Sequence, residues 1–274
     1  MSTSAPTRPA TTTSSGSGGG FSTRRTVHMA RWNAVLLTRN KLALFYATAL
    51  PLAPLLLVLA GADGDTGAGA SAIVSSVLVA GLFPVYYNVL SQFVNRRDEL
   101  VLKRMRTGEV RDSELLAAIA LPGVVVALAI IALGVPIMAA LGQPWPLNPL
   151  LVAVMALATV LMFAAFAYWT AAWTRNAEAA QLTSLPIIML AVIGQVSIAF
   201  PDTLREIVSF TPGAAITELV RVGWFGLAEG EASDPSLAFG DTWAAAGQPL
   251  LVLVAWTAIA LDLMRRSMRW EPRS

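Results

Sequence analysis

The chain of 274 residues is 55% hydrophobic and only 13% charged, and its mean hydropathy is +0.63. This is more apolar surface than one soluble core of that length can bury, so we expect a membrane protein. The absence of cysteine excludes disulfides and thiolate metal sites. The single histidine, His28, argues against a histidine-ligated metal centre or a Ser/His/Asp triad. We therefore expect neither a metal site nor catalytic residues in this chain.

The first segment, residues 1–23, is rich in Ser, Thr, Gly and Pro and has almost no large apolar side chains. Such a composition cannot offset the entropy of ordering, so we predict a disordered tail, followed by a transmembrane domain over residues 24–274. That domain opens with "TVHMARWNAVLLTRNKLALF", in which apolar residues and the basic Arg31 and Arg39 recur at roughly helical spacing. The pattern predicts an amphipathic helix on the inner leaflet.

Six stretches have the roughly 20 mostly apolar residues that a helix needs to cross the hydrocarbon core. No strand-like alternation suited to a membrane barrel recurs along the chain. Since only helices and closed barrels satisfy their backbone groups in lipid, we predict an all-α polytopic membrane protein with six transmembrane helices. The predicted spans are 42–60, 71–94, 115–141, 149–173, 179–199 and 244–264.

The basic residues are distributed unequally between the two sides of these spans. Seventeen of the 19 Lys and Arg residues lie on the side of the N-terminus, and only Arg205 and Arg221 lie on the other. Under the positive-inside rule, both termini are cytoplasmic and the chain is a multi-pass protein of the cell membrane. This distribution also explains the isoelectric point of about 9.3. We expect no nucleic-acid partner, which would need a basic patch on a soluble face.

The densest charge lies between spans two and three, in "NRRDELVLKRMRTGEVRDSELL". Here the acidic Asp98 and Glu99 precede the basic Lys103, Arg104 and Arg106. This order predicts a short helix whose charges suit its macrodipole. On residue physics alone two interpretations stay open. The charges either fix the topology at the membrane surface or form the rim of a docking helix that meets a soluble partner.

Spans two and five carry weakly polar side chains rather than buried charges. In span two, these groups recur three and four residues apart and therefore share one helical face. Since no charged residue lies well inside a span, proton- or ion-coupled transport lacks its usual intramembrane carboxylate. The weakly polar side chains are Tyr87, Asn88, Ser91 and Gln92 in span two and Gln195 in span five.

The segment between spans five and six, residues 200–243, is too polar and acidic to cross the membrane. Within it, "LREIVSFTPGAAITELVRVGWFGL" has a helical periodicity that breaks at Pro212 and Gly213. We predict two short re-entrant helices that dip into the outer leaflet.

The string "VNRRDELVLKRMRTGEVRDSELLAAIALP" resembles the cytoplasmic loop between spans two and three of ABC type-2 transporter permeases. The segment "RWNAVLLTRNKLALFYATALPLAPLLLVL" looks like that family's connecting helix and first span. The segment "LPIIMLAVIGQVSIAFPDTLREIVSFTPGAAITELVR" is similar to its fifth span and re-entrant helices. The chain departs from the family at Glu109, where many members have proline, and in "VIGQ", where they have a Ser-Gly pair. These departures leave the subfamily and its substrate open.

The resemblance implies the permease subunit of an ATP-driven exporter, whose substrate is a hydrophobic or amphiphilic drug, antibiotic, lipid or glycan precursor. It implies a homodimer with two ATP-binding subunits that hold ATP and Mg, so this chain binds no cofactor and is not an enzyme. The implied contacts with the ATPase, through a coupling helix, are Arg96, Arg97, Asp98, Glu99, Lys103, Arg104 and Arg106. Arg31 and Arg39 lie on the connecting helix, and the implied translocation path, shared by spans two and five, includes Tyr87, Asn88, Ser91, Gln92 and Gln195.

The motor must lie on another chain, because no G-x-x-x-x-G-K-[ST] motif occurs in the sequence. Two other classes of function stay open. A membrane scaffold or sensor component would not transport, and co-purification with an ATPase would distinguish it from a permease. An intramembrane enzyme, the less favoured alternative, would need a clustered Ser/His, paired Asp or His-rich site within the spans, and the sequence has none.

Overall fold

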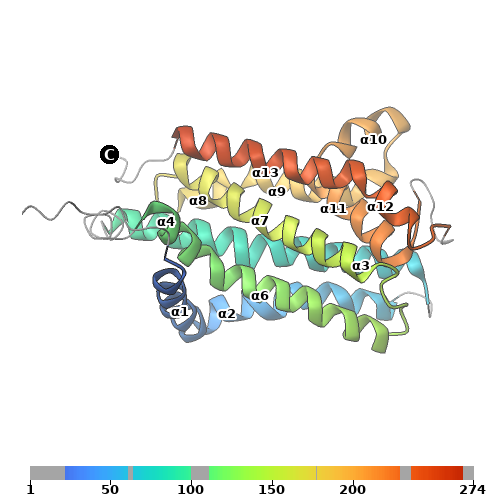
Figure 1. Cartoon of the computed structure of the whole chain (residues 1–274), viewed down its shortest axis with the longest axis horizontal. Helices are drawn as coiled ribbons and strands as arrows, with labels where there is room; N and C mark the ends of the chain where they lie inside the picture. The colour runs from blue at the N-terminus through green and yellow to red at the C-terminus, as the bar shows by residue number, and fades with distance from the viewer. Residues whose placement is uncertain (1–21, 61–63, 100–110, 177, 229–235, 268–274) are drawn as a thin grey trace, which may run out of the picture.

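The computed structural model describes residues 22–60, 64–99, 111–176, 178–228 and 236–267. Over these ranges the chain forms a bundle of helices without any strand (Figure 1). The predicted disordered tail lies outside the described residues, apart from residues 22 and 23.

Six helical segments in the described ranges are long and apolar enough to cross a membrane, as predicted. Several of them consist of consecutive pieces with different winding. The spans are α2 (Lys41–Leu52) with the 3-10 segment η1 (Ala53–Ala60); α3 (Thr66–Ala80), the π-helical η2 (Gly81–Tyr87) and α4 (Asn88–Asp98); α6 (Asp112–Ala140); α7 (Pro149–Trp173); α8 (Ala179–Thr183), α9 (Leu185–Val192) and the 3-10 segment η3 (Ile193–Ala199); and α13 (Gly247–Ser267).

The remaining elements lie at the two ends of the bundle. Helix α1 precedes span one, and four short elements connect spans five and six. They are α1 (Thr23–Arg39), α10 (Asp202–Ser209), α11 (Pro212–Val220), the π-helical η4 (Arg221–Phe225) and α12 (Asp241–Ala245).

Prolines lie where two spans depart from α-helical winding. Pro51 and Pro54 lie where α2 passes into the 3-10 geometry of η1, and Pro84 lies inside η2. Proline has no N–H group and its ring clashes with the carbonyl four residues earlier, so the local winding changes. By contrast, α6 remains α-helical through Pro122 and Pro136.

Span two extends beyond its predicted range at both ends and covers Thr66–Asp98. At its C-terminal end the helix continues through Arg96 and Arg97, because both guanidinium groups find hydrogen-bond acceptors inside the bundle. The order of acidic before basic residues predicted that Asp98 begins a separate helix. In the structure Asp98 is instead the last residue of α4. Residues 100–110, where the rest of the predicted coupling helix falls, lie outside the described residues.

Spans two and four form the centre of the bundle, where most of their residues are buried. Two glycines allow neighbouring helices to approach the π-helical part of span two. A Cβ at Gly81 would lie 2.3 Å from the ring of Phe163 on α7. A Cβ at Gly123 of α6 would lie only 1.9 Å from the carbonyl oxygen of Pro84. The contact of the Phe163 ring with Gly81 and the backbone contact at Gly123 together set the spacing of spans two, three and four.

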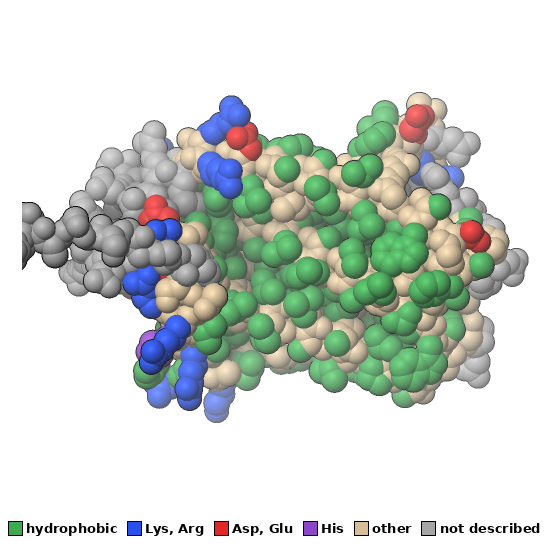
Figure 2. All heavy atoms as spheres, viewed as in Figure 1, with side chains coloured by type: hydrophobic (Ala, Val, Ile, Leu, Met, Phe, Trp, Pro, Cys, Tyr) green, Lys and Arg blue, Asp and Glu red, His purple; other side chains and the backbone are tan. Residues whose placement is uncertain are grey.

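The outward surface of the peripheral spans is apolar. Leu59, Leu182 and Leu251 are 68%, 72% and 70% exposed. Figure 2 shows hydrophobic side chains around the middle of the bundle and Lys and Arg side chains at the end that carries α1. The C-terminal end of α13 lies at the same end (Figure 1), which we call the basic end. An apolar belt of this extent is expected of a protein surrounded by lipid.

The first two of the four elements between spans five and six, α10 and α11, are separated just before Pro212, where the sequence predicted a break. Helix α11 packs closely on span five, since a Cβ at Gly213 or at Gly194 would meet backbone atoms of the other segment at about 2 Å. The indole Nε1 of Trp256 on α13 donates to the carbonyl oxygen of Phe210 in the turn between the two helices, at 2.8 Å. Span six is thereby joined to this turn.

We predict that Gly123→Ala destabilises the bundle, because the added methyl group clashes with the Pro84 carbonyl oxygen and separates spans two and three. Overpacking of this kind costs about 1–3 kcal/mol. The measurement is the thermal-unfolding midpoint of the detergent-purified protein. Gly247→Ala is the matched control, because a Cβ at Gly247 has no other atom within 4 Å. Equal midpoints for the two variants would contradict the assigned contact.

Candidate functional site

The candidate site begins at the C-terminal end of α4, where the predicted ATPase contact starts. Arg96 and Arg97 are adjacent in sequence but point to different neighbours. Asp98 and Glu99 follow them and are exposed. The remaining predicted contact residues, Lys103, Arg104 and Arg106, lie outside the described residues.

Arg97 is fully buried, with 0% of its side chain exposed, and it points toward the C-terminal end of α7. Its guanidinium donates to the carbonyl oxygens of Ala171 at 2.9 Å, of Thr174, and of Arg175 at 3.1 Å. Carbonyl groups at the end of a helix lack partners within it and carry partial negative charge, so a cation there supplies both hydrogen bonds and charge compensation. Arg97 therefore joins span two to the end of span four.

Arg96 takes part in a chain of side-chain hydrogen bonds that crosses three helices. Its Nη2 donates to Oδ1 of Asn33 on α1 at 2.6 Å and to Oε1 of Gln92 at 3.1 Å. Nδ2 of Asn33 donates to the carbonyl oxygen of Ala118 on α6 at 2.6 Å. Nε2 of Gln92 donates to Oδ1 of Asn88 at 2.8 Å. We call Asn33, Arg96, Gln92 and Asn88 the amide–arginine chain.

This chain connects two groups of residues that the sequence analysis treated separately. Asn88 and Gln92 belong to the predicted translocation path, and Arg96 belongs to the predicted ATPase contact. Asn88 lies ten residues before the end of α4, or about 15 Å along the helix axis. A displacement of α1 or of the end of α4 would therefore reach Asn88, about two thirds of the way along span two, through directly hydrogen-bonded side chains.

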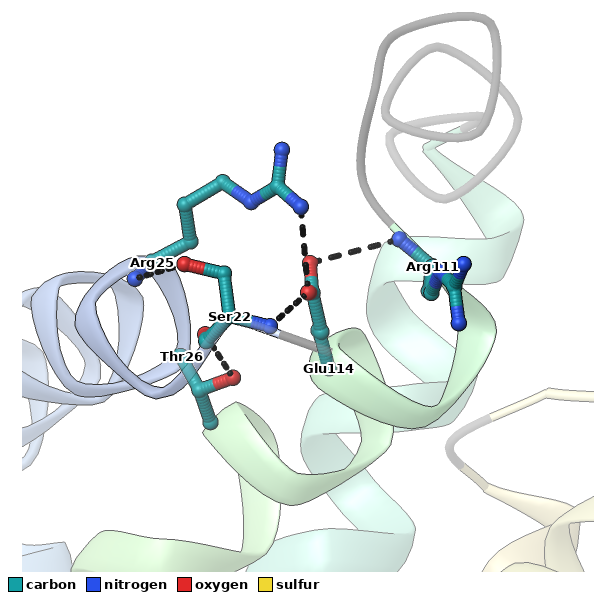
Figure 3. A network of polar contacts seen from close by, with 5 residues as sticks. All are labelled: Ser22, Arg25, Thr26, Arg111 and Glu114. Atoms are coloured by element: carbon teal, nitrogen blue, oxygen red, sulfur yellow. Dashed lines mark hydrogen bonds and ion pairs between the residues drawn. The ribbon is translucent and has the colours of Figure 1, made fainter. Parts of the chain in front are cut away.

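The start of α1 is attached to the start of α6 by the buried carboxylate of Glu114 (Figure 3). Glu114 is 0% exposed and accepts hydrogen bonds from the backbone N–H of Ser22 at 2.6 Å and from Nη2 of Arg25 at 3.2 Å. Its other oxygen accepts from the backbone N–H of Arg111 at 3.4 Å. A carboxylate in the first turn also complements the helix macrodipole. Glu114 thus fixes α1 across the basic end of span three.

One face of span two remains partly open within the single chain. Residues at four-residue intervals along it are exposed or half-buried, whereas most of their neighbours are buried. This spacing follows the i, i+4 row of a helix, so the open residues form one line. We call this line the span-two face; its members are Ser71, Ser75, Val79, Phe83, Tyr87, Ser91 and Asn95.

Spans one and five flank the span-two face. On one side the ring of Tyr46 from α2 stacks on Phe83, with the ring centroids 6.2 Å apart. On the other side, the hydroxyl groups of Tyr87 and Ser184 lie 3.1 Å apart. Further along the face, the Gln195 side chain donates to the hydroxyl of Ser75. The structure thus places Gln195 beside span two.

The two arginines predicted on the connecting helix, Arg31 and Arg39, are exposed on α1. Sequence reasoning missed Asn33 and Glu114, which attach α1 to the bundle. The signal for Asn33 was its place on the same helical face as Ala30 and Leu37, both of which are buried. For Glu114 it was a carboxylate in the first turn of an otherwise apolar span. Within the described residues, no group of His, Cys, Asp and Glu side chains is placed to hold a metal ion.

We predict that Arg97→Leu lowers the free energy of unfolding by about 1–3 kcal/mol, because three carbonyl oxygens, two of them buried, lose a donor. Arg266→Leu removes an exposed arginine at the same end of the bundle, whose ion pair with Asp262 is exposed. We expect it to change stability little. The measurement compares the thermal-unfolding midpoints of both variants with that of the unmodified chain. A change in Arg97→Leu no larger than in Arg266→Leu would contradict the role assigned to Arg97.

Comparison with known proteins agrees with this architecture. A family model described as "ABC-2 family transporter protein" matches residues 42–263, which is most of the chain and includes all six spans in whole or in large part. A search of curated proteins finds no match. Permeases of this family pair with ATP-binding subunits, and ATP is bound by the separate ATPase subunit. The chain therefore belongs to the ABC-2 family of transporter proteins and is a membrane permease domain without a nucleotide-binding site of its own.

Proposed function

We propose that this permease exports a hydrophobic or amphiphilic substrate, such as a drug, an antibiotic, a lipid or a glycan precursor. Two copies of the chain pair with two ATP-binding subunits and carry out the transport together. The observation that supports this proposal best is the amide–arginine chain, which connects the charged end of α4 and helix α1 to Gln92 and Asn88 within span two.

The basic end of the bundle faces the cytoplasm in this proposal. Lys and Arg residues concentrate there, at α1, at the end of α4 and at the end of α13, as the positive-inside rule requires of a cytoplasmic end. The ATP-binding subunit docks on the segment from Arg96 to Arg106. Asp98 and Glu99 are exposed at the start of this segment, although the Asp98 carboxylate also lies 3.8 Å from Nε of Arg97. Arg97 itself points inward and holds the segment on span four.

ATP-driven closure of the two motor subunits moves the docking segment and α1 as a rigid body. Arg96 and Arg97 transmit this movement by two routes. Arg96 passes it along the amide–arginine chain to Asn88, and Arg97 passes it to the end of α7. These contacts are buried or half-buried. Few water molecules can therefore compete for the same hydrogen bonds, so the contacts persist as the helices move.

The translocation path runs between the span-two faces of two copies, with span five beside each. The face combines hydroxyl groups, such as those of Tyr87 and Ser91, with the aromatic ring of Phe83 and has no charged residue between Ser71 and Asn95. Such a surface suits an amphiphilic substrate and offers no carboxylate for coupling to an ion gradient. Hydrolysis of ATP on the partner subunit supplies the free energy for transport.

We predict that charge reversal at the docking segment uncouples the motor. Glu99→Arg and Arg104→Glu should each abolish substrate-stimulated ATPase activity of the reconstituted complex, because like charges then face each other across the contact. Membrane insertion should be unchanged. Arg266→Glu, on the C-terminal part of α13, is the control and should keep its activity. Normal stimulated activity in both docking variants would exclude this segment as the ATPase contact, and failure of the chain to co-purify with any ATPase would favour a scaffold or sensor role.

We also predict that Asn88→Leu and Gln92→Leu change the range of transported substrates more than they change expression, because each removes a polar group beside the path. The measurement is uptake of a panel of amphiphilic dyes into inverted vesicles that contain the complex. Leu251→Ala on span six, whose side chain is 70% exposed, provides the control. If the Leu251 variant alters the substrate range and the span-two variants do not, the path lies elsewhere.

A further inference from the structure

Helix α1 carries a second feature, which the amide–arginine chain does not use. Arg24, Arg31 and Arg39 are exposed and lie seven and eight residues apart, so they share one side of the helix. Lys41 follows at the first residue of α2 and is also exposed. The sequence has no Asp or Glu before Asp63. We call Arg24, Arg31, Arg39 and Lys41 the α1 basic stripe.

The stripe faces away from the bundle. The opposite side of α1, with Thr26, Ala30, Asn33 and Leu37, is buried and has no charge. The helix's other arginine, Arg25, forms an ion pair with the buried Glu114. The Glu114 carboxylate is therefore paired with Arg25 and not with the stripe. The positive charge of the stripe is therefore not compensated by any acidic residue of α1 itself.

Large apolar side chains adjoin the stripe. Trp32 and Leu36, one turn apart on α1, are 62% and 59% exposed. The apolar surface continues onto span one, where Leu42 and Phe45 are 64% and 55% exposed. Figure 2 shows the Lys and Arg side chains near α1 directly beside the hydrophobic belt. Cations at the edge of an apolar belt, next to an exposed tryptophan, lie at the depth of lipid headgroups.

We propose that the α1 basic stripe binds the phosphate groups of anionic phospholipids in the adjacent leaflet. An acidic protein surface would match the charge but would leave Trp32 and Leu36 without an apolar environment, whereas a lipid satisfies both. Each arginine near an anionic membrane surface strengthens binding about fivefold, so the three arginines together contribute on the order of a hundredfold. The proposal does not depend on transport or on the identity of the substrate.

The experiment uses the purified full chain in an uncharged detergent, titrated with phosphatidylglycerol or with phosphatidylcholine, and counts bound lipid by native mass spectrometry. We expect the unmodified chain to bind phosphatidylglycerol preferentially and to lose most of this preference when Arg24, Arg31 and Arg39 are all replaced by Gln. Replacement of the same three residues by Lys should preserve it, because a lysine ammonium also binds phosphate. Binding should weaken as salt is raised.

The matched control replaces Arg265 and Arg266 by Gln, which removes charge from the same end of the bundle without touching α1. An equal loss of phosphatidylglycerol in this control would overturn the proposal, because the binding would then reflect only the overall charge of that end. Unchanged binding in the triple Gln variant would overturn it as well. Displacement of the bound lipid by the ATP-binding subunit would instead assign the stripe to that protein. Thermal-unfolding midpoints establish that each variant is folded.

Discussion

The arrangement of this protein depends on how its basic end satisfies buried charges where little water reaches them. Arg97 and Glu114 are both fully buried. Arg97 donates to carbonyl oxygens at and just beyond the end of α7. Glu114 accepts from the Ser22 N–H and the Arg25 side chain at the start of α1, and from the Arg111 N–H at the start of its own helix. Breaking such a contact leaves an uncompensated charge, which is far more costly than losing a surface ion pair. These two residues therefore hold the helices of the basic end in fixed relative positions.

Between these two fixed points lies the amide–arginine chain, which reaches Asn88 of span two from α1 and α6. Span two is one of the two central spans, and its π-helical segment at Pro84 lies closely against α6 at Gly123. A helix with irregular winding beside a glycine contact can change its local geometry at lower cost than a regular helix. In the proposed mechanism, movement at the basic end reaches span two at Asn88, directly after this π-helical segment.

Membership of the ABC-2 family gives this architecture its functional context, because such permeases work with a separate ATP-binding subunit. The surface of α1 adds a different kind of contact. Its buried side is bonded to the bundle, while its outer side combines arginines with exposed Trp32 and Leu36. In our proposals, this one short helix contacts both the transport helices and the lipid surface, which links the composition of the membrane to the element that the ATP-binding subunit moves.

The sequence by itself determined the six spans, the amphipathic helix before them and the break at Pro212, because hydrophobic length, helical periodicity and proline act locally. Helical spacing also placed Ser91 near Tyr87 and Asn88 on span two, whereas the grouping of Gln195 with them came from the family resemblance. Only the tertiary structure decided that Arg97 points inward, that Arg96 meets Asn33, and that Glu114 attaches α1 to α6. Each of these contacts joins residues far apart in sequence, and its partner is set by which helices pack together, a property that no local pattern of residues encodes.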